Sequence, residues 1–165
     1  LAFFESGLIR ARSALSVIFQ VFSGLAIGSV CWFIFGFSLV NGDTLGGFIG
    51  NPWTFFVLRG IPLGDCHPNA PTIPAQAFLL FQMMFAVITP LLMTGAFAER
   101  MRIRPALAFM FLWEIIVFYP VAHWIWSSEG WLNKLGVLDF AGGIVIHTTA
   151  GAGALVCGLI LRRRP

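Results

Sequence analysis

The sequence has few charged residues and few cysteines. Only 10% of its 165 residues are Asp, Glu, Lys or Arg. Soluble domains carry about 25%, so the composition excludes a water-exposed globular domain. Three scattered cysteines, Cys31, Cys66 and Cys157, are too few for a disulfide framework or a zinc site, and we expect neither a metal nor a cofactor. The sequence also lacks a basic tract interleaved with polar aromatic residues, which argues against a nucleic-acid partner.

Apolar and aromatic side chains dominate instead. Hydrophobic residues make up 58% of the chain, and 18 Phe with 6 Trp exclude a disordered chain. This composition indicates an integral membrane protein with the lipid bilayer as its surroundings. Residue 1 is Leu rather than Met, and residues 1–9 resemble the end of an apolar helix. We therefore expect the sequence to be an interior piece of a longer protein.

Four stretches are long enough to cross a membrane as helices. Crossing about 30 Å of hydrocarbon takes roughly 20 apolar residues, and a helix satisfies its own backbone hydrogen bonds in lipid. The sequence thus predicts an all-α, multi-pass transmembrane helical bundle that forms a single partial domain over residues 1–165. The expected spans are a partial one at about 1–9 and full ones at 13–40, 73–98, 106–126 and 138–161.

Arginines predict the orientation of these spans. They gather at alternate ends of the spans, at Arg10, Arg12, Arg100, Arg102, Arg104, Arg162, Arg163 and Arg164. The two other connectors, 41–72 and 127–137, contain one Arg or Lys each, Arg59 and Lys134. By the positive-inside rule the arginine-rich ends are cytoplasmic and these two connectors are outside. Connector 41–72 is rich in Gly and Pro, which predicts an irregular but ordered loop.

Ionisable residues inside lipid are costly and are therefore functional candidates. His147 lies near the middle of the last span; it is either a core imidazole bonded to a neighbouring helix, or a neutral imidazole that lines a pore or passes a proton. Asp139 precedes the same span, where capping of the first turn is the favoured role and negative potential at an outer mouth is the alternative. Glu114 in the third full span is either a proton-linked acid or pairs with a polar group in a part of the protein outside this sequence.

Three aromatic residues are expected near the outer ends of their spans. Phe81 and Phe85 are four residues apart and so share one helix face, and Trp126 ends the third full span. Ordinary packing and an interfacial tryptophan belt would explain them. A cluster of ring faces could equally bind a small cation, because cation–π attraction is worth about 2 kcal/mol when desolvated.

Four segments together resemble the ammonium transporter family. They are residues 7–10 with 14–16, residues 81–82 with 85–86 and 95–100, residues 119–126, and residues 139–151. The resemblance covers nearly the whole chain, and Trp126 favours the Amt/Mep branch over the Rhesus-type relatives.

This resemblance implies an eleven-helix bundle with an inverted five-helix repeat and one pore per subunit, assembled as a homotrimer. The chain would contain the end of helix one and helices two to five. Phe81 and Trp126 would form the aromatic wall of an outer ammonium site, and Phe85 would be one of two gate phenylalanines. Asp139 would be the buried acid that supports the site, and His147 the first of two pore histidines.

The predicted function is transport of ammonium or ammonia across a membrane, most simply the plasma membrane, with methylammonium as an analogue. No covalent chemistry is needed, so we predict that the protein is not an enzyme. One alternative is an ammonium-sensing receptor. Another is a membrane haem subunit with His123 and His147 as axial ligands, but their different depths argue against it.

Overall fold

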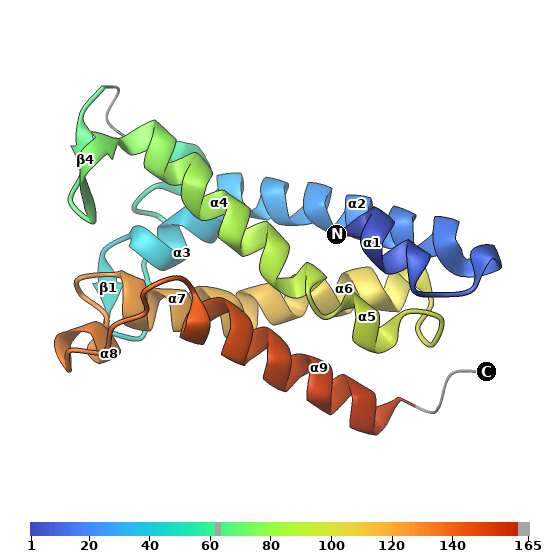
Figure 1. Ribbon diagram of the computed structural model, residues 1–165. Coiled ribbons are helices and arrows are strands. Elements are labelled where there is room, and N and C mark those ends of the chain that lie inside the picture. Colours follow the sequence, from blue (N-terminus) through green and yellow to red (C-terminus); the bar gives the residue numbers. More distant parts are fainter. Residues whose placement is uncertain (62–63, 162–165) are drawn as a thin grey trace.

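The computed structural model describes residues 1–61 and 64–161 and shows an elongated helical bundle (Figure 1). The arginines at 162–164 lie outside the described residues. Within the described part, four helical segments are long and apolar enough to span a membrane: Ala11–Asn41, Ala75–Phe97, Ile103–Lys134 and Gly143–Ile160. The predicted all-α multi-pass bundle is confirmed.

The helices follow one another along the bundle. In chain order they are α1 (Ala2–Gly7), α2 (Ala11–Cys31), α3 (Phe37–Asn41), α4 (Ala75–Leu91), α5 (Thr94–Phe97), α6 (Ile103–Trp113), α7 (Tyr119–Trp126), α8 (Trp131–Lys134) and α9 (Thr149–Ile160). Turns of π-helix at Trp32–Gly36 and Glu114–Phe118 join α2 to α3 and α6 to α7, and a third at Gly143–Thr148 leads into α9. Pro90 lies in the last turn of α4, just before the break that separates it from α5.

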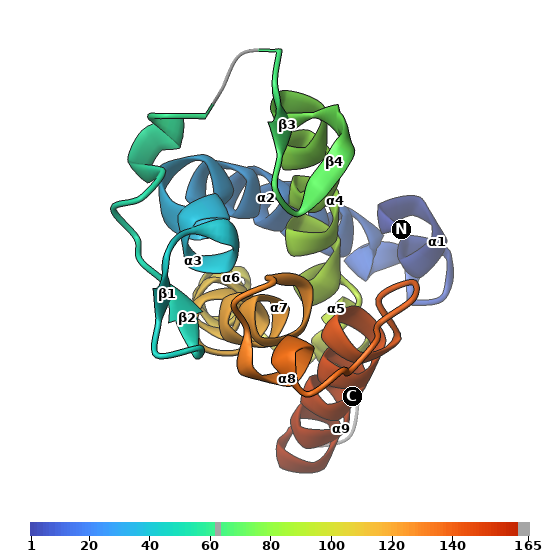
Figure 2. The same ribbon diagram turned by 90° about the vertical axis from the view of Figure 1, so that its left-hand side faces the viewer.

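One end of the bundle carries β1, β4 and α8, and we call it the loop end (Figure 1). The connector 41–72 is less irregular than expected, because it contains two short antiparallel hairpins. Strands β1 (Thr44–Leu45) and β2 (Ile49–Gly50) form the first, and β3 (Cys66–His67) pairs with β4 (Ala70–Pro74) in the second. Figure 2 looks onto this end and shows the second hairpin beside the start of α4. A short 3₁₀ turn, Phe56–Leu58, lies between the hairpins.

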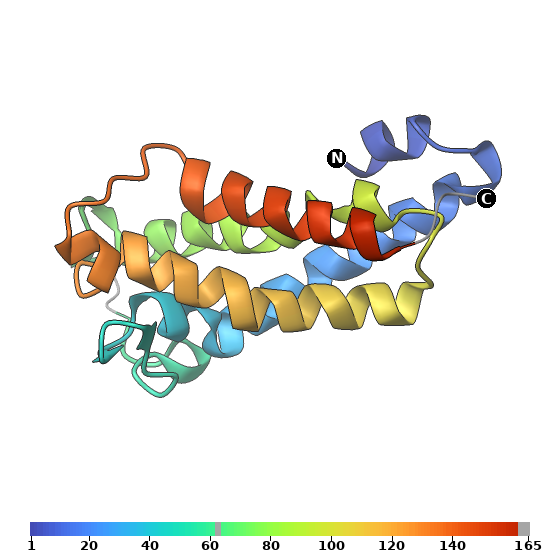
Figure 3. The same cartoon turned by 90° about the horizontal axis from the view of Figure 1, so that it is seen from below.

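Close packing of large side chains joins the first three long segments. Trp32, Phe37 and Tyr119 are fully buried, and the Trp32 indole N–H donates to the Leu79 carbonyl of α4 at 3.1 Å. Gly36 makes room for the tyrosine, since a Cβ there would lie 2.7 Å from the Tyr119 hydroxyl oxygen. The helix that follows the last connector, α9 (Figure 3), packs against α5, and a Cβ at its Gly153 would lie 3.1 Å from the Trp113 indole nitrogen at the end of α6.

A polar partner for Glu114 was expected outside this sequence, but the structure supplies one within it. Glu114 is 2% exposed, and the Tyr119 hydroxyl donates to its Oε1 at 2.8 Å. Both residues belong to the same helical segment, within and just after the π-helical turn Glu114–Phe118. The carboxyl group therefore has a local partner, five residues along the chain.

Candidate functional site

A cavity of about 360 Å³ opens at the loop end, between α4, α7 and the segment that precedes α9. Its lining is mainly aromatic and apolar, with a few amide and carboxylate side chains. It comprises Asn69, Phe78, Phe81, Gln82, Phe85, Ile125, Trp126, Asn133, Val137, Leu138, Asp139, Phe140, Ala141 and Gly142. Of the site residues predicted from the sequence, the cavity brings together Phe81, Phe85, Trp126 and Asp139.

The three predicted aromatic residues form a chain of ring contacts with Phe85 in the middle. The Phe81 and Phe85 rings meet edge to face, with centroids 4.8 Å apart and an interplanar angle of 83°. The Phe85 ring lies 5.6 Å from the Trp126 ring at 55°. Trp126 is fixed from behind by Phe118, 6.3 Å away. Rings at several inclinations therefore border one cavity, an arrangement compatible with cation–π attraction.

Asp139 caps the start of the last helical segment, as the favoured reading of the sequence predicted. Its Oδ1 accepts from the Ile144 N–H and its Oδ2 from the Val145 N–H, both at 3.1 Å. Gly142, with φ of 79°, provides the left-handed turn between the acid and the helix. The carboxylate thus complements the positive end of the helix dipole while adding negative charge to the cavity lining.

Removing this cap should loosen the first turn of the segment. We expect Asp139→Ala to cost about 1 kcal/mol of local stability, seen as faster hydrogen exchange of the Ile144 and Val145 amides. Asp65→Ala is the matched control, because Asp65 lies in the connector before β3. Equal exchange rates in Asp139→Ala and the unaltered protein would contradict the capping role.

His147 does not line the cavity. It lies on the π-helical turn Gly143–Thr148, five residues beyond Gly142 and deeper in the span. Its side chain is exposed within the described residues. The structure therefore places the histidine outside the aromatic cavity, further along the last helical segment.

A second histidine, His67, does not line the cavity but contacts Phe78, which does. The His67 ring stacks on Phe78 with centroids 5.2 Å apart, and its Nδ1 accepts from the Asn69 N–H at 3.2 Å. Burial lowers the pKa of His67, because the charged form is the one that desolvation disfavours. A neutral imidazole adds no positive charge beside a cavity suited to a cation.

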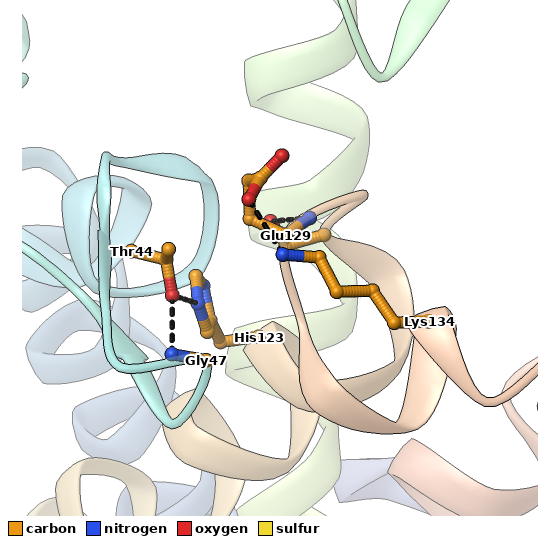
Figure 4. A network of polar contacts seen from close by, with 6 residues as sticks. Thr44, Gly47, His123, Glu129 and Lys134 are labelled. Carbon is orange, nitrogen blue, oxygen red and sulfur yellow. Dashed lines mark hydrogen bonds and ion pairs between the residues drawn. The ribbon is translucent and has the colours of Figure 1, made fainter.

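His123 has a structural role that the sequence did not reveal. Its Nδ1 donates to the Val40 carbonyl at 2.7 Å, so its Nε2 is the acceptor for the Thr44 hydroxyl at 2.9 Å. The Thr44 oxygen also accepts from the Gly47 N–H at 2.8 Å (Figure 4). Both ring nitrogens are occupied by these bonds, which leaves neither available to a haem iron. Figure 4 also shows the exposed ion pair of Glu129 with Lys134 nearby.

Sequence reasoning also missed the amides in the cavity lining, Asn69, Gln82 and Asn133. Gln82 could have been found, because it lies four residues after Phe78 and three before Phe85 and so shares their helix face. The asparagines could not, since they lie outside α4, in the second hairpin and on α8.

The chain is similar to known proteins along its whole length. Residues 1–165 match the profile of the Ammonium Transporter Family. Ammonium transporter 1 of Dictyostelium discoideum is 57% identical over 165 residues, which are 99% of this chain and 35% of that protein. The crystal structure of Saccharomyces cerevisiae Mep2 superposes with a TM-score of 0.78 at 39% identity, over 88% of this chain and 32% of that one. A structure titled Sensor Amt Protein superposes with a TM-score of 0.82 at 31% identity, over 93% of this chain and 38% of that one.

The chain spans about a third of the length of these relatives. Within that third, the match is continuous from the first residue to the last. Four membrane-length helices in the described residues, the aromatic cavity between them and the matching profile lead to one assignment. The chain belongs to the ammonium transporter family.

Proposed function

We propose that the full-length protein transports ammonium across the plasma membrane and is not an enzyme. The observation that carries this proposal is the cavity bordered by Phe81, Phe85 and Trp126, in a chain that belongs to the ammonium transporter family. A relative 57% identical to it is named as an ammonium transporter. Methylammonium is the analogue of choice for assays. The loop end, whose connectors carry few arginines, faces outside in this proposal.

The cavity selects a cation before it enters the span. Ring quadrupoles attract ammonium, and the Asp139 carboxylate in the lining adds negative potential. In the proposed pore the ion leaves water for an apolar span, which favours release of a proton, since desolvation penalises the charged form. His147, deeper in the span, then accompanies the neutral ammonia and helps to pass the proton.

The proposed assembly is a homotrimer in a lipid bilayer. Large apolar side chains on α9 are exposed in the isolated chain, among them Leu155 at 64% and Leu159 at 77%. Such faces need cover from lipid, from other helices of the protein or from neighbouring subunits. In this proposal lipid, the remaining helices and the neighbouring subunits of the trimer share that cover.

Sensing is the second candidate function. It is favoured by the similarity to the structure titled Sensor Amt Protein, with its TM-score of 0.82. A receptor and a transporter share the outer binding step and differ in whether ions cross. Uptake of labelled methylammonium by cells that lack other ammonium transporters separates the two: saturable uptake establishes transport, and its absence with retained binding establishes sensing.

The aromatic cavity predicts the effect of Trp126→Leu in the same assay. The substitution removes roughly 1–2 kcal/mol of cation–π attraction, so we expect the half-saturation concentration for methylammonium to rise about tenfold. Trp53→Leu is the matched control, because Trp53 lies at the same end of the bundle but is 71% exposed and outside the cavity lining. An unchanged half-saturation concentration in Trp126→Leu would show that this tryptophan only packs.

A further inference from the structure

We propose that Gln82 is a specificity-determining residue of the outer site, whose side-chain oxygen accepts a hydrogen bond from the bound ammonium. This inference rests on the proposed function. It concerns recognition of the N–H groups of ammonium. The aromatic rings cannot supply this recognition, because a ring face attracts any small cation and accepts hydrogen bonds only weakly. Ammonium has N–H groups in every direction, and each one that enters the cavity without an acceptor loses a hydrogen bond to water.

The other polar side chains of the lining are already held by the protein. The Asn69 amide N–H donates to Asn41 Oδ1 at 3.2 Å. The Asn133 amide N–H donates to the Ile125 carbonyl at 2.9 Å. Both Asp139 oxygens accept backbone N–H groups at the start of the last helical segment. Bonds inside the protein thus fix the orientation of all three side chains.

Gln82 differs from these residues. It lines the cavity, it is 8% exposed, and its Oε1 has no hydrogen-bond partner among the described residues. A buried acceptor without a donor is uncommon in native structures and calls for an explanation. The oxygen is shielded from solvent as placed. The proposal therefore includes a rotation of the amide about its terminal bond, which would move the oxygen out of this shielded position, and no hydrogen bond of the oxygen opposes that rotation.

Its position suits this role. Gln82 follows Phe81 directly and lies one turn before Phe85 on α4, so the amide is placed beside the two rings that border the cavity. An ammonium ion against the rings then meets an amide oxygen at its side. The rings would supply attraction for the charge and the amide would supply recognition of the N–H group.

The chain provides a matched control in Gln20. This residue is 2% exposed and its Oε1 also lacks a partner in the described structure. However, its amide N–H donates to the Met101 carbonyl at 3.4 Å, and it borders a different cavity together with Ser13 and Arg102. Loss of a buried amide as such affects both glutamines, whereas loss of a ligand acceptor affects only Gln82.

The test measures methylammonium uptake by the full-length protein carrying Gln82→Leu, Gln82→Met, Gln82→Glu or Gln20→Leu. We expect the Leu and Met variants to raise the half-saturation concentration about tenfold, the effect of losing one charge-assisted hydrogen bond. Gln82→Glu, which restores an acceptor oxygen, should return it to the unaltered value or below. Gln20→Leu should leave it unchanged. The Met variant keeps the length and flexibility of the side chain. It preserves the test if the protein carrying Gln82→Leu does not fold.

Two results would overturn the inference. One is an unchanged half-saturation concentration in both the Leu and Met variants. The other is an equal increase in all the Gln82 variants, Glu included, which would show that the residue only packs. Failure of the proposed function looks different, because the unaltered protein itself would then show no saturable uptake.

Discussion

Replacing His147 with alanine in the full-length protein is expected to lower the ammonium-dependent current about a hundredfold, the lower range for loss of a positioned proton-transfer group. The imidazole has two ring nitrogens that can take up and release a proton, and its place near the middle of the span would make it a carrier for the proton of ammonium. The substitution removes that carrier and also a hydrogen-bonding partner for ammonia. The measurement is current across a supported membrane with reconstituted protein.

Within the described residues the His147 side chain lies outside the packed core, so its removal leaves that core intact and assembly should survive the change. Thr148→Ala is the neighbouring control: it removes a hydroxyl that donates to the Gly143 carbonyl at 2.8 Å on the same turn. Current in Thr148→Ala should stay within a few-fold of the unaltered protein. A full current in His147→Ala would instead assign the histidine to packing.

Unlike His147→Ala, which should leave assembly intact, His123→Ala should cause a large loss of stability. The imidazole is fully buried, and its removal leaves the Val40 carbonyl and the Thr44 hydroxyl without their partner. Each unsatisfied buried group costs about 1–3 kcal/mol, and the space left by the ring adds a further penalty. We expect a loss of roughly 3 kcal/mol or more, measured as a lower thermal midpoint in detergent.

Thr44→Val provides a graded comparison for this effect. It removes the hydroxyl that bonds His123 and Gly47 but keeps the His123 bond to the Val40 carbonyl. Its midpoint should fall between those of the unaltered protein and His123→Ala. A midpoint for His123→Ala equal to that of the unaltered protein would show that the hairpin of β1 and β2 is held by other contacts.

Composition and motif order were enough to predict the helical bundle and the family. The four long apolar stretches left only a helical solution in lipid, and the Asp139 cap followed from an acid placed before a helix. The contact of Phe81 with Phe85 followed from their spacing on one helix face. These features depend on local sequence, which is why reading along the chain recovers them.

The features that could not be predicted depend on residues far apart in the sequence. His123 and Thr44 are 79 residues apart, and no periodicity in either segment points to the other. The contact of Tyr119 with Gly36 likewise depends on how two helices cross. The central position of the Phe85 ring, between Phe81 and Trp126, required the packing of α4 against α7.

The π-helical turns have a consequence for how relatives should be aligned. In the described part of the chain they interrupt two of the long helical segments, at Trp32–Gly36 and Glu114–Phe118, and a third turn, Gly143–Thr148, begins the last segment. Each turn contains one residue more than the α-helix it replaces, and one residue corresponds to a rotation of about 100°. A relative with a single-residue gap at such a point would keep both flanking helices in register with the bundle. Alignment gaps inside these membrane helices are therefore to be expected at the π-helical turns and should not be shifted into the loops.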